Sequence, residues 1–159
     1  MNKIEGMNLI DLAEKGVFDA IIHGCNCFHT MGAGIAKEIK ERYPQAYNED
    51  KKTPYGSRLK LGNYSFTIID SPTDENPDHF FYIINGYTQF HYKKSKTNLD
   101  ENYKAISDLF ERISNDFVSQ RIGFPMIGAG LAGGDWNIIS KIIEEKLGDN
   151  LVYTLVTLK

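Results

Sequence analysis

Residues 19–36 read DAIIHGCNCFHTMGAGIA, and this stretch decides how the chain folds. Its first seven residues form a short apolar run that ends in glycine and cysteine, which is typical of a buried strand. Apolar residues then recur at helical spacing up to Ile39, and Pro44 follows soon after, so a helix is predicted over residues 33–42. A strand that passes through a glycine-rich loop into a helix indicates an α/β protein.

The rest of the chain continues this alternation. Residues 43–62 are polar and turn-rich, so we expect a surface excursion there, and residues 71–78 read as a turn or loop. Apolar runs predict strands, and apolar residues at helical spacing predict helices. The predicted strands are 64–70, 80–87, 122–127 and 151–158, and the predicted helices are 98–113 and 136–147. The order predicts a single α/β domain over residues 1–159, with three layers and a largely parallel or mixed sheet.

Composition narrows the classes of function. The formal net charge is −3, which gives no basic surface for nucleic acid. No apolar run approaches the roughly 18 residues that span a bilayer, and the first five residues lack a signal-peptide hydrophobic region. Cys25 and Cys27 are too close to form a disulfide that closes a stabilising loop. We therefore expect a cytoplasmic protein in a reducing compartment, with no nucleic-acid or membrane partner.

Two glycine-rich loops follow predicted strands and lead into predicted helices. The carboxyl ends of strands bind ligands in open α/β sheets, and glycines let backbone N–H groups approach an anion. A helix N-terminus adds about half a positive charge. The residues expected to grip a diphosphate are Gly32, Ala33, Gly34 and Ile35 in loop one, and Gly128, Ala129, Gly130, Leu131, Ala132 and Gly133 in loop two. Alternatively, these glycines only form tight turns, since neither loop has a Walker A or a complete dinucleotide-binding motif.

Several polar side chains near the loops have two possible roles. Asn26 is expected to bond ribose hydroxyls, or else to cap a turn. His23 lies within an apolar strand, so it is either a core residue or a catalytic group. Asp135 either caps the helix that begins at Trp136 or acts as a base beside loop two.

Residues 85–94 should reach the same edge of the sheet, where His91 and Tyr92 are expected to contact substrate. Cys25, Cys27 and His29 lie close together in the sequence, but no second cluster supplies the other ligands of a zinc ion. No metal site is therefore predicted.

With these motifs in place, the chain resembles the macro domain family, an ADP-ribose-binding α/β/α module. His23-Gly24-Cys25-Asn26 takes the place of the family's Asn-Ala-Ala-Asn strand end, and residues 32–36 take that of its Gly-Gly-Gly-Val-Ala turn. Residues 128–133 resemble its Ser-Thr-Gly-Ile-Tyr/Phe-Gly phosphate loop. The element order agrees over nearly the whole chain. The resemblance implies an α/β/α fold with a central mixed sheet, ADP-ribose or a derivative as ligand, and no cofactor.

Departures from the family pattern indicate a branch. Asn26 keeps the asparagine that faces the distal ribose in the family, whereas His23 replaces its first asparagine and Ala132 replaces an aromatic residue. These features are similar to the ADP-ribose-1''-phosphate phosphatase branch, where a histidine at the position of His23 is implicated in catalysis. The aspartate that contacts adenine in the family is absent here, and the resemblance implies that Asn8 makes this contact instead.

The resemblance implies hydrolysis of the phosphate monoester of ADP-ribose 1''-phosphate, with Asn26 holding the distal ribose and Asp135 or His23 acting as the base. One alternative is hydrolysis of O-acetyl-ADP-ribose or of ADP-ribosyl esters, with an ADP-ribosylated protein as partner. The branch that acts on protein esters uses a lysine and an aspartate. Its aspartate falls at Ala132 and its lysine near His91 or Tyr92, so that mechanism has little support. A non-catalytic reader of ADP-ribose and a binder of another nucleotide would use the same two loops.

Overall fold

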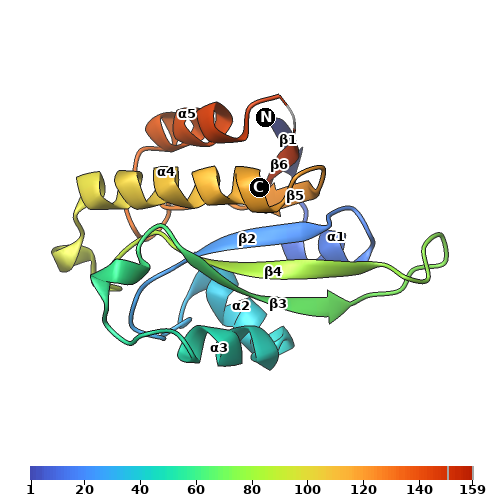
Figure 1. Ribbon diagram of the computed structural model, residues 1–159, viewed down its shortest axis with the longest axis horizontal. Helices are drawn as coiled ribbons and strands as arrows, with labels where there is room; N and C mark the ends of the chain where they lie inside the picture. Colours follow the sequence, from blue (N-terminus) through green and yellow to red (C-terminus); the bar gives the residue numbers. More distant parts are fainter. Residues whose placement is uncertain (150, 159) are drawn as a thin grey trace.

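A central sheet with helices on both faces forms the core of the protein (Figure 1). The computed structural model describes residues 1–149 and 151–158, so residues 150 and 159 of the predicted domain lie outside the described residues. The strands are β1 (Asn2–Glu5), β2 (Ala20–Cys25), β3 (Tyr64–Asp70), β4 (Phe80–Tyr87), β5 (Arg121–Phe124) and β6 (Val152–Thr157). The helices are α1 (Leu9–Glu14), α2 (Gly34–Arg42), α3 (Pro44–Lys51), α4 (Leu99–Asp116) and α5 (Trp136–Leu147), with short 3-10 helices η1 (Arg58–Lys60) and η2 (Lys94–Lys96).

The sheet is mixed, as the sequence predicts. Its six strands lie in the order β1-β6-β5-β2-β4-β3. Only the pairing of β3 with β4 is antiparallel among the strands described; the others run parallel. Because β2 pairs with both β4 and β5, the segments that follow these three strands emerge at one edge of the sheet.

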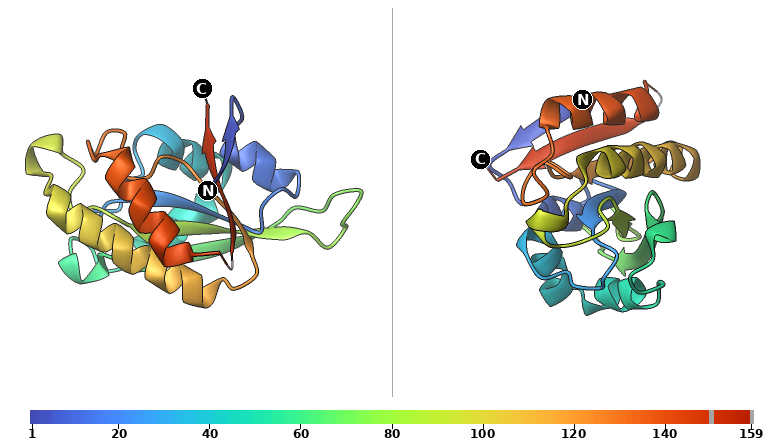
Figure 2. Two further views of the ribbon diagram at one scale, coloured as in Figure 1. Left: turned by 90° about the horizontal axis from the view of Figure 1, so that it is seen from above. Right: turned by 90° about the vertical axis from the view of Figure 1, so that its left-hand side faces the viewer.

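The two faces of the sheet carry separate hydrophobic clusters. On one face, α4 and α5 lie side by side and pack residues such as Ile106 and Ile139 against the strands (Figure 2). On the other face, α1, α2 and α3 contribute Ile10, Ile39 and Ala46. This arrangement confirms the predicted three layers. No helix within the described part of the chain is long and apolar enough to cross a membrane.

The polar stretch after α2 differs from its prediction as a surface excursion. It contains α3 and η1, and Ala46 of α3 is fully buried. Pro44 is the first residue of α3, where its fixed φ suits a helix and its missing N–H group is not needed. The helix was missed because its eight residues show no strong apolar periodicity. The N-terminal elements β1 and α1 were also not predicted.

Candidate active site

A cleft of about 760 Å³ lies where the two glycine-rich loops meet the ends of β2, β4 and β5. The cleft occupies the edge of the sheet that the sequence predicts. Its floor lies between β2 and β4, whose last residues Cys25 and Tyr87 are partners in the parallel register. The lining residues are Gly24, Cys25, Asn26, Thr30, Met31, Gly32, Ala33, Gly34, Ile35, Ala36, Asp50, Thr88, Gln89, Tyr92, Pro125, Met126, Ile127, Gly128, Gly130, Leu131 and Ala132.

Loop one presents the N-terminus of α2 to this cleft. Gly32, Ala33, Gly34 and Ile35 all line it. Gly34 has a φ of +56°, in the left-handed region that glycine tolerates best, and it opens the helix directly after Ala33. No side chain among the described residues caps α2. The N–H groups at the start of this helix therefore have no side-chain acceptor, and the helix dipole places a partial positive charge there that favours an anion.

Loop two contributes only part of its predicted set. Gly128, Gly130, Leu131 and Ala132 line the cleft, whereas Ala129 and Gly133 do not. Ala129 packs against the cluster beneath α4 and α5. The N–H group of Gly133 donates to the Gly130 carbonyl at 3.0 Å, which closes the loop on itself.

Asn26 lies in the cleft wall and also stabilises loop one. Its Oδ1 atom accepts a hydrogen bond from the N–H group of Phe28 at 2.8 Å, and its Nδ2 atom donates to Thr30 Oγ1 at 2.6 Å. Both roles considered for this residue are thus compatible. The amide nitrogen carries two hydrogens, so one remains for a ligand hydroxyl.

His23 lies behind the cleft, in the core between β2 and the α2–α3 layer. It is fully buried, and its Nε2 atom lies 2.7 Å from Asn85 Oδ1. Burial lowers the pKa of His23, which favours the neutral ring. The ring is buried in the core and is not part of the cleft lining, which matches the other of the two roles considered for it, so a catalytic role of His23 stays a prediction.

Asp135 caps a helix, which was the simpler of its two predicted roles. Its Oδ1 atom accepts a hydrogen bond from the N–H group of Asn137 at 2.8 Å, so it satisfies the first turn of α5. The lining of loop two ends at Ala132, before Asp135. Asp135 and Trp136, the first residue of α5, are thus not among the lining residues, whereas Gly34 and Ile35 at the start of α2 are.

Asn8 and His91 also lie outside the cleft lining. Asn8 caps α1 by accepting from the N–H group of Asp11 at 3.0 Å, and it donates to Glu38 Oε1 at 2.8 Å. His91 accepts from the N–H group of Lys93 at 2.9 Å and stacks on Tyr92, with ring centroids 4.4 Å apart. Tyr92, the other predicted contact, is the aromatic side chain that reaches the cleft.

Two buried polar residues of the cleft were missed by sequence reasoning. Asp50, at 1% exposure, comes from α3, and Thr88, also at 1%, follows β4 directly. Asp50 was missed because its segment was interpreted as a surface excursion. Thr88 could have been found, since it lies just past a strand that ends at the ligand-binding edge of the sheet.

The two thiols beside Asn26 are free and protonated. Burial raises the pKa of Cys25 well above its ordinary value and raises that of Cys27 to about 11. Neither thiol is therefore activated as a nucleophile at neutral pH. Within residues 1–149 and 151–158, no group of three His, Cys, Asp or Glu residues is arranged to hold a metal ion.

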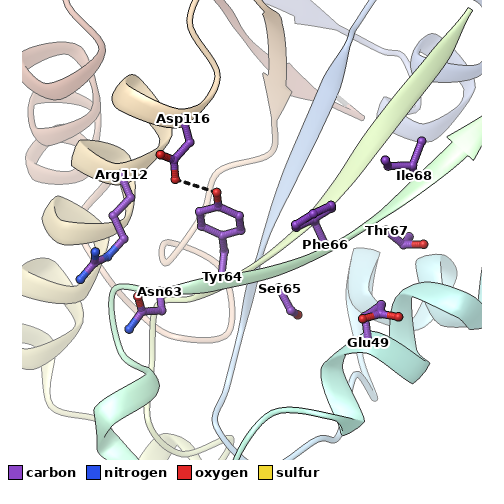
Figure 3. Close-up of a pocket in the computed structure, with 9 residues that line it drawn as sticks. All are labelled: Glu49, Asn63, Tyr64, Ser65, Phe66, Thr67, Ile68, Arg112 and Asp116. Carbon is purple, nitrogen blue, oxygen red and sulfur yellow. Dashed lines mark hydrogen bonds between the residues drawn. The ribbon is translucent and has the colours of Figure 1, made fainter.

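A second groove, of about 700 Å³, runs along the outer edge of the sheet (Figure 3). It is lined by β3 residues, by Arg112 and Asp116 of α4 and by Glu49 of α3. The Tyr64 hydroxyl donates to Asp116 Oδ2 at 2.7 Å across it. The predicted site residues and both glycine loops lie outside this groove.

Comparison with known proteins gives one family. The family model described as Macro domain matches residues 22–143. An uncharacterized 17.5 kDa protein of Enterobacteria phage T4 is 36% identical over 78% of this chain and 77% of its own length. The ADP-ribose 1''-phosphate phosphatase of Saccharomyces cerevisiae is 28% identical over 87% of this chain and 89% of its own. The DNA ADP-ribosyl glycohydrolase of Mycobacterium tuberculosis is 26% identical over 77% of this chain, which spans 33% of that protein.

Solved structures show the same fold. The macrodomain of Thermus aquaticus DarG superposes with a TM-score of 0.68 at 24% identity, covering 98% of this chain and 96% of its own. Thermosipho africanus DarTG in complex with ADP-ribose gives a TM-score of 0.68 at 16% identity, covering 99% of this chain and 42% of its own.

Proposed function

This chain belongs to the macro domain family, and on that premise we propose that it hydrolyses ADP-ribose 1''-phosphate to ADP-ribose and phosphate. One observation carries the proposal: a single cleft is lined by both glycine-rich loops and by Asn26. Among the relatives, the yeast protein named for this phosphatase activity aligns over most of both chains.

The cleft holds the ligand mainly through backbone groups. The uncapped N-terminus of α2 donates to the diphosphate from one side, and Gly130 to Ala132 close on it from the other. Asn26 donates its remaining amide hydrogen to a hydroxyl of the distal ribose. Anion binding of this kind needs no lysine or arginine, so a net charge of −3 does not oppose it.

Catalysis then depends on positioned donors and on one base. Phosphate monoesters hydrolyse very slowly without a catalyst, and N–H groups aimed at the phosphoryl oxygens stabilise the charge of the transition state. A base must take a proton from the attacking water. His23 and Asp135 are not among the residues that line the cleft, so we look for this base among the residues that do.

A second candidate is cleavage of the bond between ADP-ribose and a macromolecule. Relatives named DNA ADP-ribosyl glycohydrolase support it. Tyr92, which lines the cleft, also supports it, because its side chain is 52% exposed and its ring lies 6.2 Å from that of Phe28. An exposed aromatic ring in the cleft lining provides contact area for a group larger than phosphate.

The test is a comparison of substrates with one enzyme preparation. We expect release of inorganic phosphate from ADP-ribose 1''-phosphate, and binding of the product ADP-ribose by calorimetry. Release of ADP-ribose from ADP-ribosylated DNA or protein, without phosphate release, would move the assignment to the second candidate. Binding without turnover of any substrate would make the protein a reader of ADP-ribose.

A further inference from the structure

Two polar side chains, Asp50 and Thr88, line the cleft from elements other than the glycine loops. Asp50 lies in the last turn of α3 and Thr88 directly after β4, and each is only 1% exposed. Both lie next to the last residue of β2: the N–H group of Thr88 donates to the Cys25 carbonyl at 3.2 Å, and Asp50 acts electrostatically on the Cys25 thiol. They therefore add a donor and an acceptor to a wall that otherwise consists largely of backbone and apolar groups.

The Thr88 hydroxyl has no hydrogen-bond partner within the part of the chain that the structure describes. A buried polar atom without a partner is unfavourable, and such atoms are rare in folded proteins. A Cβ atom at Gly24 would lie 2.7 Å from Thr88 Oγ1, so the absence of a side chain at this position keeps the hydroxyl free of a clash. Because Thr88 lines the cleft, its unpartnered hydroxyl is suited to donate a hydrogen bond to an oxygen atom of a ligand.

Asp50 ends a chain of hydrogen bonds that begins at His23. Asn85 Nδ2 donates to the Ala46 carbonyl and to Ser65 Oγ, each at 3.0 Å. Asn85 Oδ1 must therefore be the acceptor of a proton on His23 Nε2, 2.7 Å away.

The remaining links follow in the same direction. The Tyr87 hydroxyl donates to Asp50 Oδ1 at 2.8 Å, a shorter contact than its 3.4 Å approach to Thr53. Ser65 Oγ, 2.8 Å from the Tyr87 oxygen, is then the donor in that pair. Every proton in this buried chain points toward Asp50, which favours the carboxylate as its final acceptor.

The titratable groups around Asp50 agree with this polarity. They are His23, Cys25, Cys27, Lys60 and Tyr87. Burial favours the neutral forms of the histidine, the thiols and the phenol. The Lys60 ammonium lies 4.5 Å from the Tyr87 ring centre and adds a positive charge nearby, although burial lowers the pKa of Lys60.

We propose that Asp50 is the catalytic base of the cleft, that Thr88 binds a substrate oxygen beside it, and that the chain from His23 to Tyr87 positions Asp50. This inference rests on the hydrolytic function proposed above. In the step, the water oxygen forms a bond to phosphorus while one of its protons passes to Asp50. The bond between phosphorus and the 1'' oxygen breaks, its electron pair stays on that oxygen, and the oxygen takes a proton from solvent.

The first test replaces the carboxylate and compares it with its neighbour on α3. Asp50→Asn should lower kcat by about 100-fold or more, the size expected for loss of a general base, while ADP-ribose still binds. The matched control is Glu49→Gln, which should turn over like the wild type. Glu49 lies on the same helix but faces the outer groove beside β3 (Figure 3).

The second test keeps Asp50 and changes its surroundings. Tyr87→Phe should lower kcat with little change in KM, because the carboxylate of Asp50 loses the donor that orients it while the contacts to the substrate remain. A merely structural role of Tyr87 would leave kcat of the folded variant unchanged. Thr88→Val should raise the Kd for ADP-ribose about tenfold, and Thr88→Ser should restore it.

The outcomes separate the inference from the proposed function. If folded Asp50→Asn turns over substrate as fast as the wild type, the assignment of Asp50 as the base is wrong, but the proposed hydrolase activity still stands. If Asp50→Asn does not fold, an unchanged kcat in Tyr87→Phe would overturn it instead. Absence of wild-type turnover on every ADP-ribose substrate would refute the proposed function and the base together.

Discussion

The substitution Gly34→Val tests whether α2 holds the diphosphate. Gly34 has a φ of +56°, and a Cβ atom built there meets no other atom within 4 Å, so the added side chain enters open space at the cleft. Its effect on folding is therefore backbone strain, which costs about 1 to 2 kcal/mol for a non-glycine residue in the left-handed region. For a chain of this size, the melting temperature should fall by roughly 2 to 8 °C.

The effect on binding should be larger. The valine side chain would stand before the first N–H groups of α2, which would lose at least two hydrogen bonds to phosphate. At about 1.5 kcal/mol or more for each bond to a charged group, the Kd for ADP-ribose should rise more than 100-fold. Calorimetric titration below the melting temperature of the variant measures this change.

Gly148→Val is the matched control. Gly148 also has a positive φ, of +62°, and open space around its Cβ position, but it lies at the C-terminal end of α5, outside the cleft lining. We expect it to destabilise the fold and to bind ADP-ribose normally. Normal binding by Gly34→Val would refute the placement of the diphosphate at loop one.

Three further outcomes are expected. Asn26→Ala should lower turnover strongly, while the free energy of unfolding should fall by only about 1 kcal/mol for each lost hydrogen bond. Turnover equal to that of the wild type in a folded variant would remove Asn26 from the site. Asp135→Ala should destabilise α5 by about 1 kcal/mol, which a thermal melt measures, and it should leave kcat unchanged. A fall in kcat would instead assign Asp135 a catalytic role. Because burial lowers the pKa of His23, the imidazole takes up a proton at higher pH in the unfolded chain than in the folded one. The free energy of unfolding should therefore fall as the pH drops from about 7 to about 5. If this pH dependence were unchanged in His23→Gln, His23 would not be its origin.

Elements with clear apolar periodicity could be predicted from the sequence. The bounds of β3, β4 and α5 match the predicted ranges. β5 ends at Phe124, short of the predicted 127, because Pro125 has no N–H group to donate to a neighbouring strand. Helix α3 escaped prediction because its stability comes from packing against the sheet rather than from its own pattern.

Some residues of the candidate site could likewise be located from the sequence, and others could not. Loop one and Asn26 could be placed because residues next to each other in the sequence form the strand, the turn and the helix start. The face of the sheet on which His23 lies could not be predicted. Strand β2 is buried on both faces, so its sequence does not alternate between apolar and polar side chains. Asp50 depended on contact between α3 and Tyr87, which is 37 residues away in the sequence.

The main-chain character of loop one has a consequence for how such a site tolerates mutation. N–H groups are common to every residue except proline, so an anion site made of them constrains the path of the chain and the size of its side chains more than their chemistry. Substitutions that keep the residues small and the left-handed turn at Gly34 preserve its donors. We therefore expect substitutions to be tolerated more readily at the rim of the cleft than along the main chain of loop one.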